Sequence, residues 1–119
     1  MVKDVSDRID FLIKHINLVE NDLEGKSAEE LSESQLLARA VSFSIMQIGE
    51  QMIKLQDVLQ EKYPDVPWSN ARSMRNVIAH MYHIIDTDQV YDVAINELPK
   101  IKKAFITIKE DVDLGRTLL

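Results

Sequence analysis

The sequence predicts an all-α fold, an antiparallel four- to five-helix up-and-down bundle. Apolar residues recur at alternating steps of three and four along four stretches of the chain, which is the spacing of amphipathic helices. Gly and Pro number only three each among 119 residues, which disfavours a turn-rich all-β fold. The connections between the stretches are short, as they are between antiparallel neighbours in a bundle. We therefore expect residues 1–119 to form a single domain around one hydrophobic core.

The first predicted helix ends near Gly25, because glycine commonly terminates a helix. Its apolar stripe consists of Val5, Ile9, Leu12, Ile16, Val19 and Leu23. The segment Ser27-Ala28-Glu29-Glu30 then has the pattern of a capping box and predicts a short helical turn. A second long helix is expected from about Ser34 to Lys62, and its middle is apolar enough for burial on more than one face. The residues near one side of it are Leu37, Val41, Ser44, Ile48, Leu55 and Leu59.

Two prolines, Pro64 and Pro67, are predicted to end this second helix and to shape a short connection. The third helix is expected to begin near Ser69 or Asn70, either of which could be its N-cap, and to continue to about residue 85. Its apolar stripe would consist of Ala71, Met74, Ile78, Met81 and Ile85.

The segment Asp86-Thr87-Asp88 is predicted to stop the third helix and to cap the fourth. The apolar residues of the fourth helix are Val90, Ala94, Leu98, Ile101, Phe105, Ile108 and Val112. Pro99 lies well inside this pattern. Because proline lacks an N–H and clashes with the preceding turn, it predicts a kink or a break there.

Composition excludes several classes of site. The chain has no cysteine, which excludes disulfides and thiolate metal sites and suits a reducing compartment. Residues 1–10 are charged where a signal peptide would be apolar, and no apolar run approaches the roughly 18 residues of a membrane span. We expect a cytoplasmic protein without a membrane partner. The formal net charge of −6 argues against general affinity for nucleic acid, because an acidic surface repels a phosphate backbone.

Charge is nevertheless unevenly distributed. No acidic residue occurs between Asp65 and Asp86. The residues that carry or can gain positive charge within this stretch are Arg72, Arg75, His80 and His83. A local basic patch of this kind can bind a phosphodiester at short range even on an acidic protein.

The third helix brings four polar residues close together. With a rotation of about 100° per residue and Arg75 at 0°, Tyr82 falls at about −20°. Asn76 falls at about +100° and His80 at about +140°. Arg75 and Tyr82 are then nearly aligned two turns apart, and Asn76 and His80 form a pair on adjacent turns.

Arginine and histidine together are suited to metal-free cleavage of RNA. The 2′-hydroxyl must lose a proton as it attacks phosphorus, the leaving 5′-oxygen must gain one, and an imidazole can do either near neutral pH. A guanidinium can donate two hydrogen bonds to the phosphoryl oxygens as their charge rises. In this interpretation Arg75 binds phosphate and His80 transfers protons. Asn76 orients the imidazole or donates to phosphate, and Tyr82 stacks or donates at the same site.

Other interpretations of these residues stay open. Arg75 could be a solvated surface residue, and His80 and Tyr82 could lie at the edge of the core. A metal site could also form from His80, His83 and Asp86, although three steps of three residues drift by about 60° each and no other helix supplies a Glu-x-x-His motif. The lysines at 100, 102 and 103 could add RNA contacts or form a solvated face.

Four segments resemble the HEPN superfamily, specifically the HepT-like toxins encoded beside a minimal nucleotidyltransferase. The spacing Arg75-x4-His80-x-Tyr82 is similar to the signature motif of that family. The segments Ile48–Gln51 (IGEQ), Pro64–Asn76 (PDVPWSNARSMRN) and Asn96–Ile101 (NELPKI) resemble its other characteristic pieces in the same order. Gln51 and Tyr91 depart from the Ala and Trp that are usual in the family.

The resemblance implies a homodimeric all-α endoribonuclease that acts on RNA without a metal or other cofactor. In the family, two third helices face each other, and both chains contribute Arg and His to a composite cleft. Carried over to this sequence, Arg75 and His80 would be catalytic, and Asn76 and Glu50 would support them.

The resemblance also implies control by a partner. The cognate minimal nucleotidyltransferase (MNT) antitoxin would transfer AMP from ATP to Tyr82. The dimer could also join the antitoxin in a hetero-oligomer. The alternative is a non-catalytic substrate-binding or scaffolding subunit of a nucleotidyltransferase complex.

Overall fold

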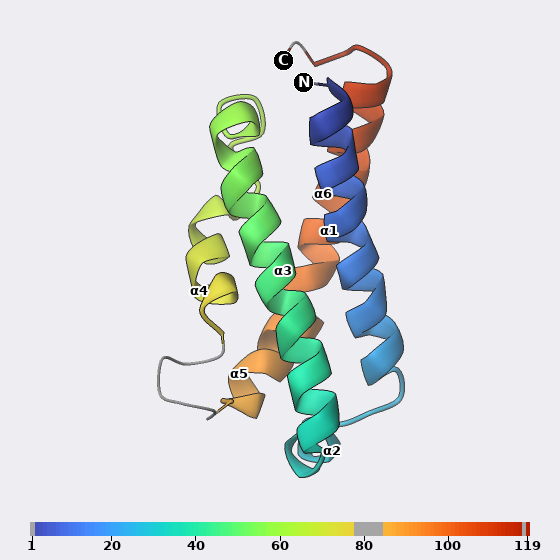
Figure 1. Ribbon diagram of the computed structural model, residues 1–119, viewed down its shortest axis with the longest axis vertical. Coiled ribbons are helices and arrows are strands. Elements are labelled where there is room, and N and C mark those ends of the chain that lie inside the picture. Colours follow the sequence, from blue (N-terminus) through green and yellow to red (C-terminus); the bar gives the residue numbers. More distant parts are fainter. Residues whose placement is uncertain (1, 78–84, 118) are drawn as a thin grey trace.

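The computed structural model describes residues 2–77, 85–117 and 119 (Figure 1). Its elements are α1 (Val2–Leu23), α2 (Ala28–Glu33), α3 (Gln35–Leu59), the 3-10 turn η1 (Trp68–Asn70), α4 (Ala71–Arg75), α5 (Thr87–Asp92), the π-helical turn η2 (Val93–Glu97) and α6 (Leu98–Asp113). The long helices α1, α3 and α6 run side by side, and α4 lies on the side of α3 away from α1 (Figure 1). The predicted all-α bundle is confirmed. Among the described residues, no helix has both the length and the apolar character needed to cross a membrane.

The core forms where the apolar stripes of α1, α3 and α6 meet. Every residue of the stripe predicted for the first helix is buried in α1. Helix α3 packs against α1 on one side and against α4 on another, so burial on more than one of its faces is also confirmed. The buried residues of α6 are Leu98, Ile101, Phe105, Ile108 and Val112.

The helix ends in the first half of the chain follow the predicted signals. Gly25 has a φ of 72°, in the left-handed region that glycine adopts readily, just after α1 ends. The Ser27 hydroxyl accepts the N–H of Glu30, and the Glu30 carboxylate accepts the N–H of Ser27, each at 3.1 Å. The Ser34 hydroxyl caps α3 by accepting the N–H of Leu37 at 3.1 Å. The capping box and the start of the second long helix are therefore confirmed.

The connection between α3 and α4 is anchored by Trp68. Its indole Nε1 donates to the carbonyl oxygen of Tyr63 at 2.9 Å. Its ring meets Phe105 of α6 edge-on, with centroids 5.7 Å apart. Because Trp68 is only 4% exposed, the segment entering α4 is tied to the core.

The third helix is shorter than predicted. Helix α4 ends at Arg75, and Asn76 leaves the helix with φ −101° and ψ 20°. Asparagine followed by β-branched Val77 has low helix propensity, which favours an end at this point. The expectation of one continuous helix to about residue 85 is wrong at Asn76 and Val77, and residues 78–84 lie outside the described residues.

The predicted start of the third helix near Asn70 is confirmed, whereas a capping hydrogen bond from that side chain is not observed. Asn70 occupies the N-cap position of α4, but its side chain does not cap the helix. Instead its Nδ2 donates to Glu97 Oε2 in η2 at 2.7 Å. The residue therefore links two elements that are far apart in the sequence.

The predicted break at Pro99 is confirmed. The fourth helix is divided into α5, the π-helical turn η2 and α6, and Pro99 lies in the first turn of α6, where its missing N–H costs least. Asp86 caps α5 as predicted, since its carboxylate accepts the N–H of Gln89 at 3.1 Å. The wider turn of η2 brings Glu97 within reach of Asn70.

Candidate functional site

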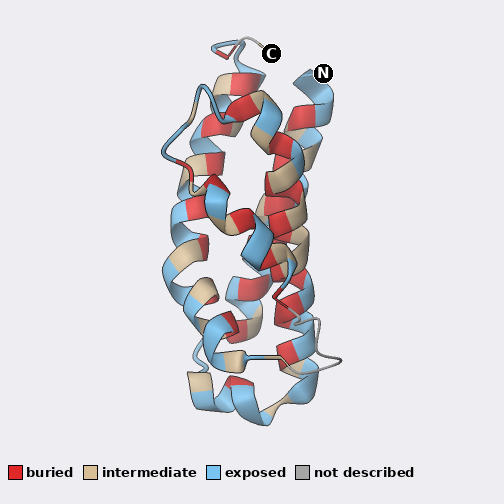
Figure 2. Ribbon diagram, turned by 90° about the vertical axis from the view of Figure 1, so that its left-hand side faces the viewer, coloured by how far each residue is buried: buried red, intermediate tan, exposed pale blue. Residues whose placement is uncertain are grey.

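Arg75 is the last residue of α4 and is half-buried. Ala71 and Met74 are buried on the inner side of this short helix, and Val77 is buried just beyond its end. Figure 2 looks onto the face that carries α4 and shows the chain entering it from the connection after α3. A helix of only five residues has little stability of its own, so this packing holds Arg75 in place.

Gly49 of α3 lies where the backbone of α4 comes closest. A Cβ at position 49 would lie 2.6 Å from the backbone nitrogen of Arg75 and 2.7 Å from the carbonyl oxygen of Ala71. Both separations are shorter than real contacts of a Cβ, and both involve backbone atoms that cannot rotate away. The absence of a side chain at Gly49 therefore allows the backbone of Arg75 to rest directly on α3.

Gly49 was not predicted as a site residue. The signal available in the sequence was an isolated glycine inside the apolar middle of a long helix. Such a glycine costs helix stability relative to alanine and often marks a close approach of another backbone. The identity of the approaching segment, however, cannot be deduced from that signal.

Glu50 follows Gly49 in α3 and is half-buried. Its Oε1 lies 3.8 Å from Nζ of Lys54 one turn further along the helix. Within the described residues, no hydrogen bond or ion pair joins Glu50 to Arg75. A supporting role for Glu50 at Arg75 therefore stays a prediction.

Asn76 forms the C-cap of α4 and is exposed. Its backbone N–H donates to the carbonyl oxygen of Arg72 at 3.1 Å. Arg72 and Arg75 thus occupy the last turn of the helix, where the negative end of the helix dipole favours positive side chains. Glu97 accepts a hydrogen bond from Asn70 at the start of α4, and Glu50 lies beside Lys54, so each of these carboxylates has a partner other than Arg75.

His80 and Tyr82 lie outside the described residues, so their predicted roles stay predictions. The alignment of Tyr82 with Arg75 assumed a continuous helix. Since α4 ends at Arg75, helical geometry does not support the predicted alignment of the two side chains. The alternative metal site is likewise untested because His80 and His83 lie outside the described residues. Among residues 2–77, 85–117 and 119, no three His, Asp or Glu side chains cluster in a way that could hold a metal ion.

His15 is a buried structural histidine. Its Nδ1 lies 3.1 Å from the hydroxyl oxygen of Ser44, and its ring meets the edges of Phe11 and Phe43. Burial, with a smaller contribution from the charge of Lys14, lowers the pKa of His15 below its ordinary value. The chain has three histidines, so His80 and His83 are the two that remain for proton transfer.

The chain is similar to a known ribonuclease family over most of its length. Residues 12–108 match a family model described as "Ribonuclease HepT-like". The matched segment includes Gly49, Glu50, Arg75 and Asn76. No solved structure matches the chain.

Several curated proteins are similar over most of the chain. "Gamma-glutamylcyclotransferase and putative RNase MJ0434" of Methanocaldococcus jannaschii is 29% identical over 116 residues, which cover 98% of this chain and 52% of that protein. The chain therefore spans about half the length of that relative. "Putative RNase MJ1216" of the same organism is 28% identical, covering 86% of this chain and 84% of that protein. "Putative RNase TTE0752" of Caldanaerobacter subterraneus subsp. tengcongensis is 24% identical, with 80% and 85% covered.

Replacing Gly49 by alanine tests the contact between α3 and α4. In an ordinary helix interior this change stabilises by about 1 kcal/mol. Here we expect a loss of about 1–3 kcal/mol, because a Cβ would force the backbone of α4 outward. Urea denaturation measures the difference. The control, Gln47→Ala in the same helix, should stay within about 0.5 kcal/mol of the parent. A Gly49→Ala protein as stable as the parent would contradict the close approach.

Proposed function

The chain belongs to the HepT-like ribonuclease family, and from this premise we propose that it is the toxin of a HEPN/MNT toxin–antitoxin system, a metal-independent endoribonuclease. The observation that carries the proposal is the placement of Arg75. It ends a short helix that rests on Gly49, inside the matched segment and within a stretch that contains no acidic residue. The guanidinium of a half-buried arginine in such a position is suited to bind a phosphodiester.

The proposed reaction is attack by the 2′-hydroxyl of RNA on the adjacent phosphorus. His80 accepts the proton of the 2′-hydroxyl as the new O–P bond forms. The P–O bond to the 5′-oxygen then breaks, and a second imidazole donates a proton to the departing oxygen. Arg75 donates hydrogen bonds to the non-bridging oxygens, whose charge rises in the transition state. The products are a 2′,3′-cyclic phosphate and a 5′-hydroxyl, and no metal or other cofactor is required.

The need for two imidazoles supports a homodimer. The structural role of His15 makes it unsuitable as the second proton-transfer group, which leaves His83 of the same chain and His80 of a second copy as the candidates. A second copy of the chain would supply another His80, so that two motifs share one composite cleft. Asn76, exposed at the end of α4, would orient an imidazole or donate to phosphate. Glu50, one residue from the contact at Gly49, would help to orient Arg75.

The same proposal includes control by a cognate minimal nucleotidyltransferase antitoxin. The phenolic oxygen of Tyr82 would attack the α-phosphorus of ATP, and pyrophosphate would leave as an O–P bond forms and the phenol proton is released. An adenylate attached within the Arg75-x4-His80-x-Tyr82 motif would bring a negative phosphate to the residues that bind RNA. Stable assembly of the dimer with its antitoxin in a hetero-oligomer is part of this proposal.

Expression without antitoxin tests the ribonuclease. We expect the parent protein to arrest growth with RNA breakdown, and Arg75→Ala and His80→Ala at equal protein levels to permit growth. With purified protein, Arg75→Ala should lower the cleavage rate by about 10²- to 10³-fold, because the hydrogen-bond donors that stabilise the transition state are removed. Arg39→Ala, an exposed arginine of α3 outside the basic stretch, serves as the matched control and should remain toxic.

The cleavage assay is repeated with a chelator, which should leave the rate unchanged. Inhibition by the chelator would support the metal site at His80, His83 and Asp86 instead. Healthy growth of cells that express the parent protein would favour a non-catalytic substrate-binding or scaffolding subunit.

Modification of Tyr82 is tested by intact mass after co-expression with the antitoxin. The parent protein should gain the mass of one or more adenylyl groups, and Tyr82→Phe should gain none. Tyr91→Phe is the control, because Tyr91 donates its hydroxyl hydrogen to the carbonyl oxygen of Lys26 at 3.0 Å, away from the motif, and this variant should still be modified. An adenylylated Tyr82→Phe protein would exclude this site.

A further inference from the structure

A basic groove lies between the connection that follows α3 and the outer face of α6, with a volume of about 470 Å³. We propose that this groove binds a nucleotide of the single-stranded RNA that flanks the cleaved bond. The inference rests on the proposed ribonuclease function and extends it to a second contact with the substrate. Its support comes from the charges, the apolar lining and the position of the groove.

The charge of the groove is opposite to that of the whole chain. Lys62, Lys100 and Lys103 line it, and Asp65 is the one acidic residue in its lining. The chain as a whole has a formal net charge of −6. Because the groove gathers three ammonium groups against one carboxylate, it favours an anionic ligand.

The lysines of the groove differ from their neighbours in having no carboxylate partner. Lys102 lies 2.7 Å from Glu20 of α1. Lys109 lies 3.0 Å from Asp10 and 3.3 Å from Asp113. In the described part of the chain, none of the three groove lysines has a carboxylate oxygen within 4.0 Å, and the remaining residues include no Asp or Glu. The bundle thus pairs the lysines that face α1 and leaves those of the groove available to a ligand.

The rest of the lining is largely apolar and suits a nucleobase. It includes the exposed Pro64 and the partly exposed Tyr63 and Ala104, with the largely buried Val66 and Ile108 beneath them. Nucleobases stack on aromatic side chains in a manner that tolerates many sequences, while lysines hold the phosphates. An anionic ligand with a flat apolar part, such as a nucleotide, therefore fits both halves of the lining.

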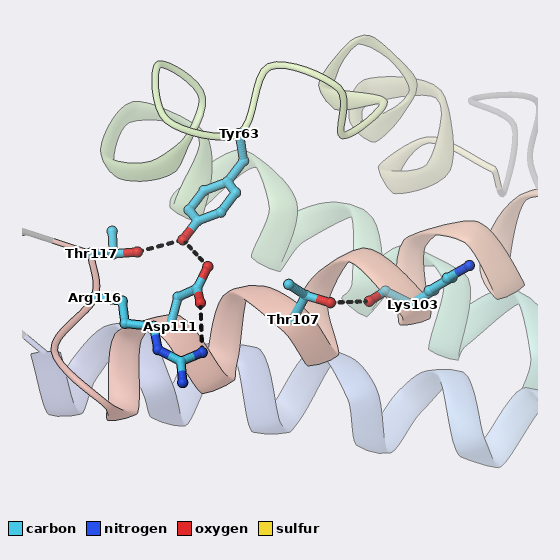
Figure 3. A network of polar contacts seen from close by, with 6 residues as sticks. All are labelled: Tyr63, Lys103, Thr107, Asp111, Arg116 and Thr117. Atoms are coloured by element: carbon cyan, nitrogen blue, oxygen red, sulfur yellow. Dashed lines mark hydrogen bonds and ion pairs between the residues drawn. The ribbon is translucent and has the colours of Figure 1, made fainter.

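The ring of Tyr63 is fixed by a polar network (Figure 3). Its hydroxyl donates to Asp111 Oδ2 at 2.9 Å and also contacts the hydroxyl of Thr117. Burial is the largest of the effects that raise the pKa of Tyr63 above its usual value. The phenol therefore stays protonated and can act as the donor to Asp111. The carboxylate of Asp111 also faces the guanidinium of Arg116 at 3.6 Å. This network holds the ring in place before a ligand arrives, which reduces the entropy cost of binding.

The groove continues into a smaller hollow of about 360 Å³ that shares Lys62 and Tyr63 with it. Arg116 and Asp111 also line this hollow, and because the guanidinium of Arg116 already faces the carboxylate of Asp111, the positive charge available to a ligand there is that of Lys62. Two adjoining hollows with shared basic and aromatic residues could accommodate more than one nucleotide of an extended strand.

The groove and Arg75 are linked through the connection that leads into α4. The connection that forms one wall continues through Trp68 into α4, and it lies on the same face as α4 in Figure 2. On the other wall, Lys100 comes one helical turn after Glu97, which binds Asn70 at the start of α4. A strand bound at the end of α4 can therefore extend along this face to the groove.

Binding of a 2′-O-methyl RNA 12-mer to the full chain, followed by fluorescence anisotropy at several salt concentrations, tests the inference. This oligonucleotide lacks the attacking hydroxyl, so binding is measured without cleavage. We expect Lys62→Gln with Lys103→Gln to weaken binding about 10-fold and to reduce the salt slope by about 1.4, or about 0.7 for each phosphate that is no longer neutralised. Replacing both lysines by arginine should preserve binding.

The matched control removes the same two charges from paired lysines of α6. Lys102→Gln with Lys109→Gln should change the affinity less than about 2-fold, since these lysines already face carboxylates. In addition, a 4-thiouracil base in the 12-mer should crosslink to Tyr63 under ultraviolet light. Equal affinities and salt slopes for the two double variants would overturn the inference.

The outcomes separate this inference from the proposed function. If the parent protein cleaves RNA but the groove variant binds the 12-mer normally, the groove is not an RNA site and the ribonuclease stands. If the parent protein cleaves nothing but the groove variant fails to bind the 12-mer, the groove stands as an RNA site and the ribonuclease fails. Loss of binding to the purified nucleotidyltransferase, with RNA binding unchanged, would assign the groove to a protein and overturn the inference.

Discussion

The contact between two backbones at Gly49 is the constraint on which the candidate site depends. The backbone nitrogen of Arg75 occupies space that any other residue at position 49 would fill with its Cβ. This contact fixes the distance between α3 and α4, and it does so in the middle of a helix that is itself held by packing against α1. Because backbone atoms cannot rotate away as a side chain can, the contact fixes the position of the Arg75 backbone, from which the side chain extends.

Other contacts hold α4 at its opposite end, since five residues cannot form a stable helix alone. Trp68 fixes the entry to α4 by packing against Phe105, and Asn70 binds Glu97 of the π-helical turn. That turn occurs just before Pro99, where the regular helix is interrupted. The Pro-x-x-Pro-Trp segment, the glycine of α3 and the proline of the last helix are distant in the sequence, yet each contributes to the position of one short helix.

Local signals in the sequence predicted most of the fold, whereas contacts between distant residues decided the site. The apolar stripe of α1, the capping box at Ser27 and the break at Pro99 each depend on neighbours within about one or two helical turns, so they could be predicted. The partner of Gly49 and the partner of Asn70 are set by packing, which the sequence pattern does not contain. Lys102 and Lys103 are adjacent and chemically identical, but only the fold places Glu20 beside the first and an open groove beside the second.

The early end of α4 reflects the weak helix propensity of Asn76 and Val77. The prediction of a longer helix gave more weight to the apolar periodicity that follows these two residues.

The central claim is that this chain cleaves RNA through the 2′-hydroxyl, with Arg75 and His80 in place of a metal ion. The chemical identity of the new RNA ends tests that claim most directly. A defined RNA would be incubated with the purified parent protein in the presence of a chelator, and the fragments would be analysed by mass spectrometry. We predict 2′,3′-cyclic phosphate and 5′-hydroxyl ends. Fragments with 3′-hydroxyl and 5′-phosphate ends, or RNA that stays intact, would contradict the claim.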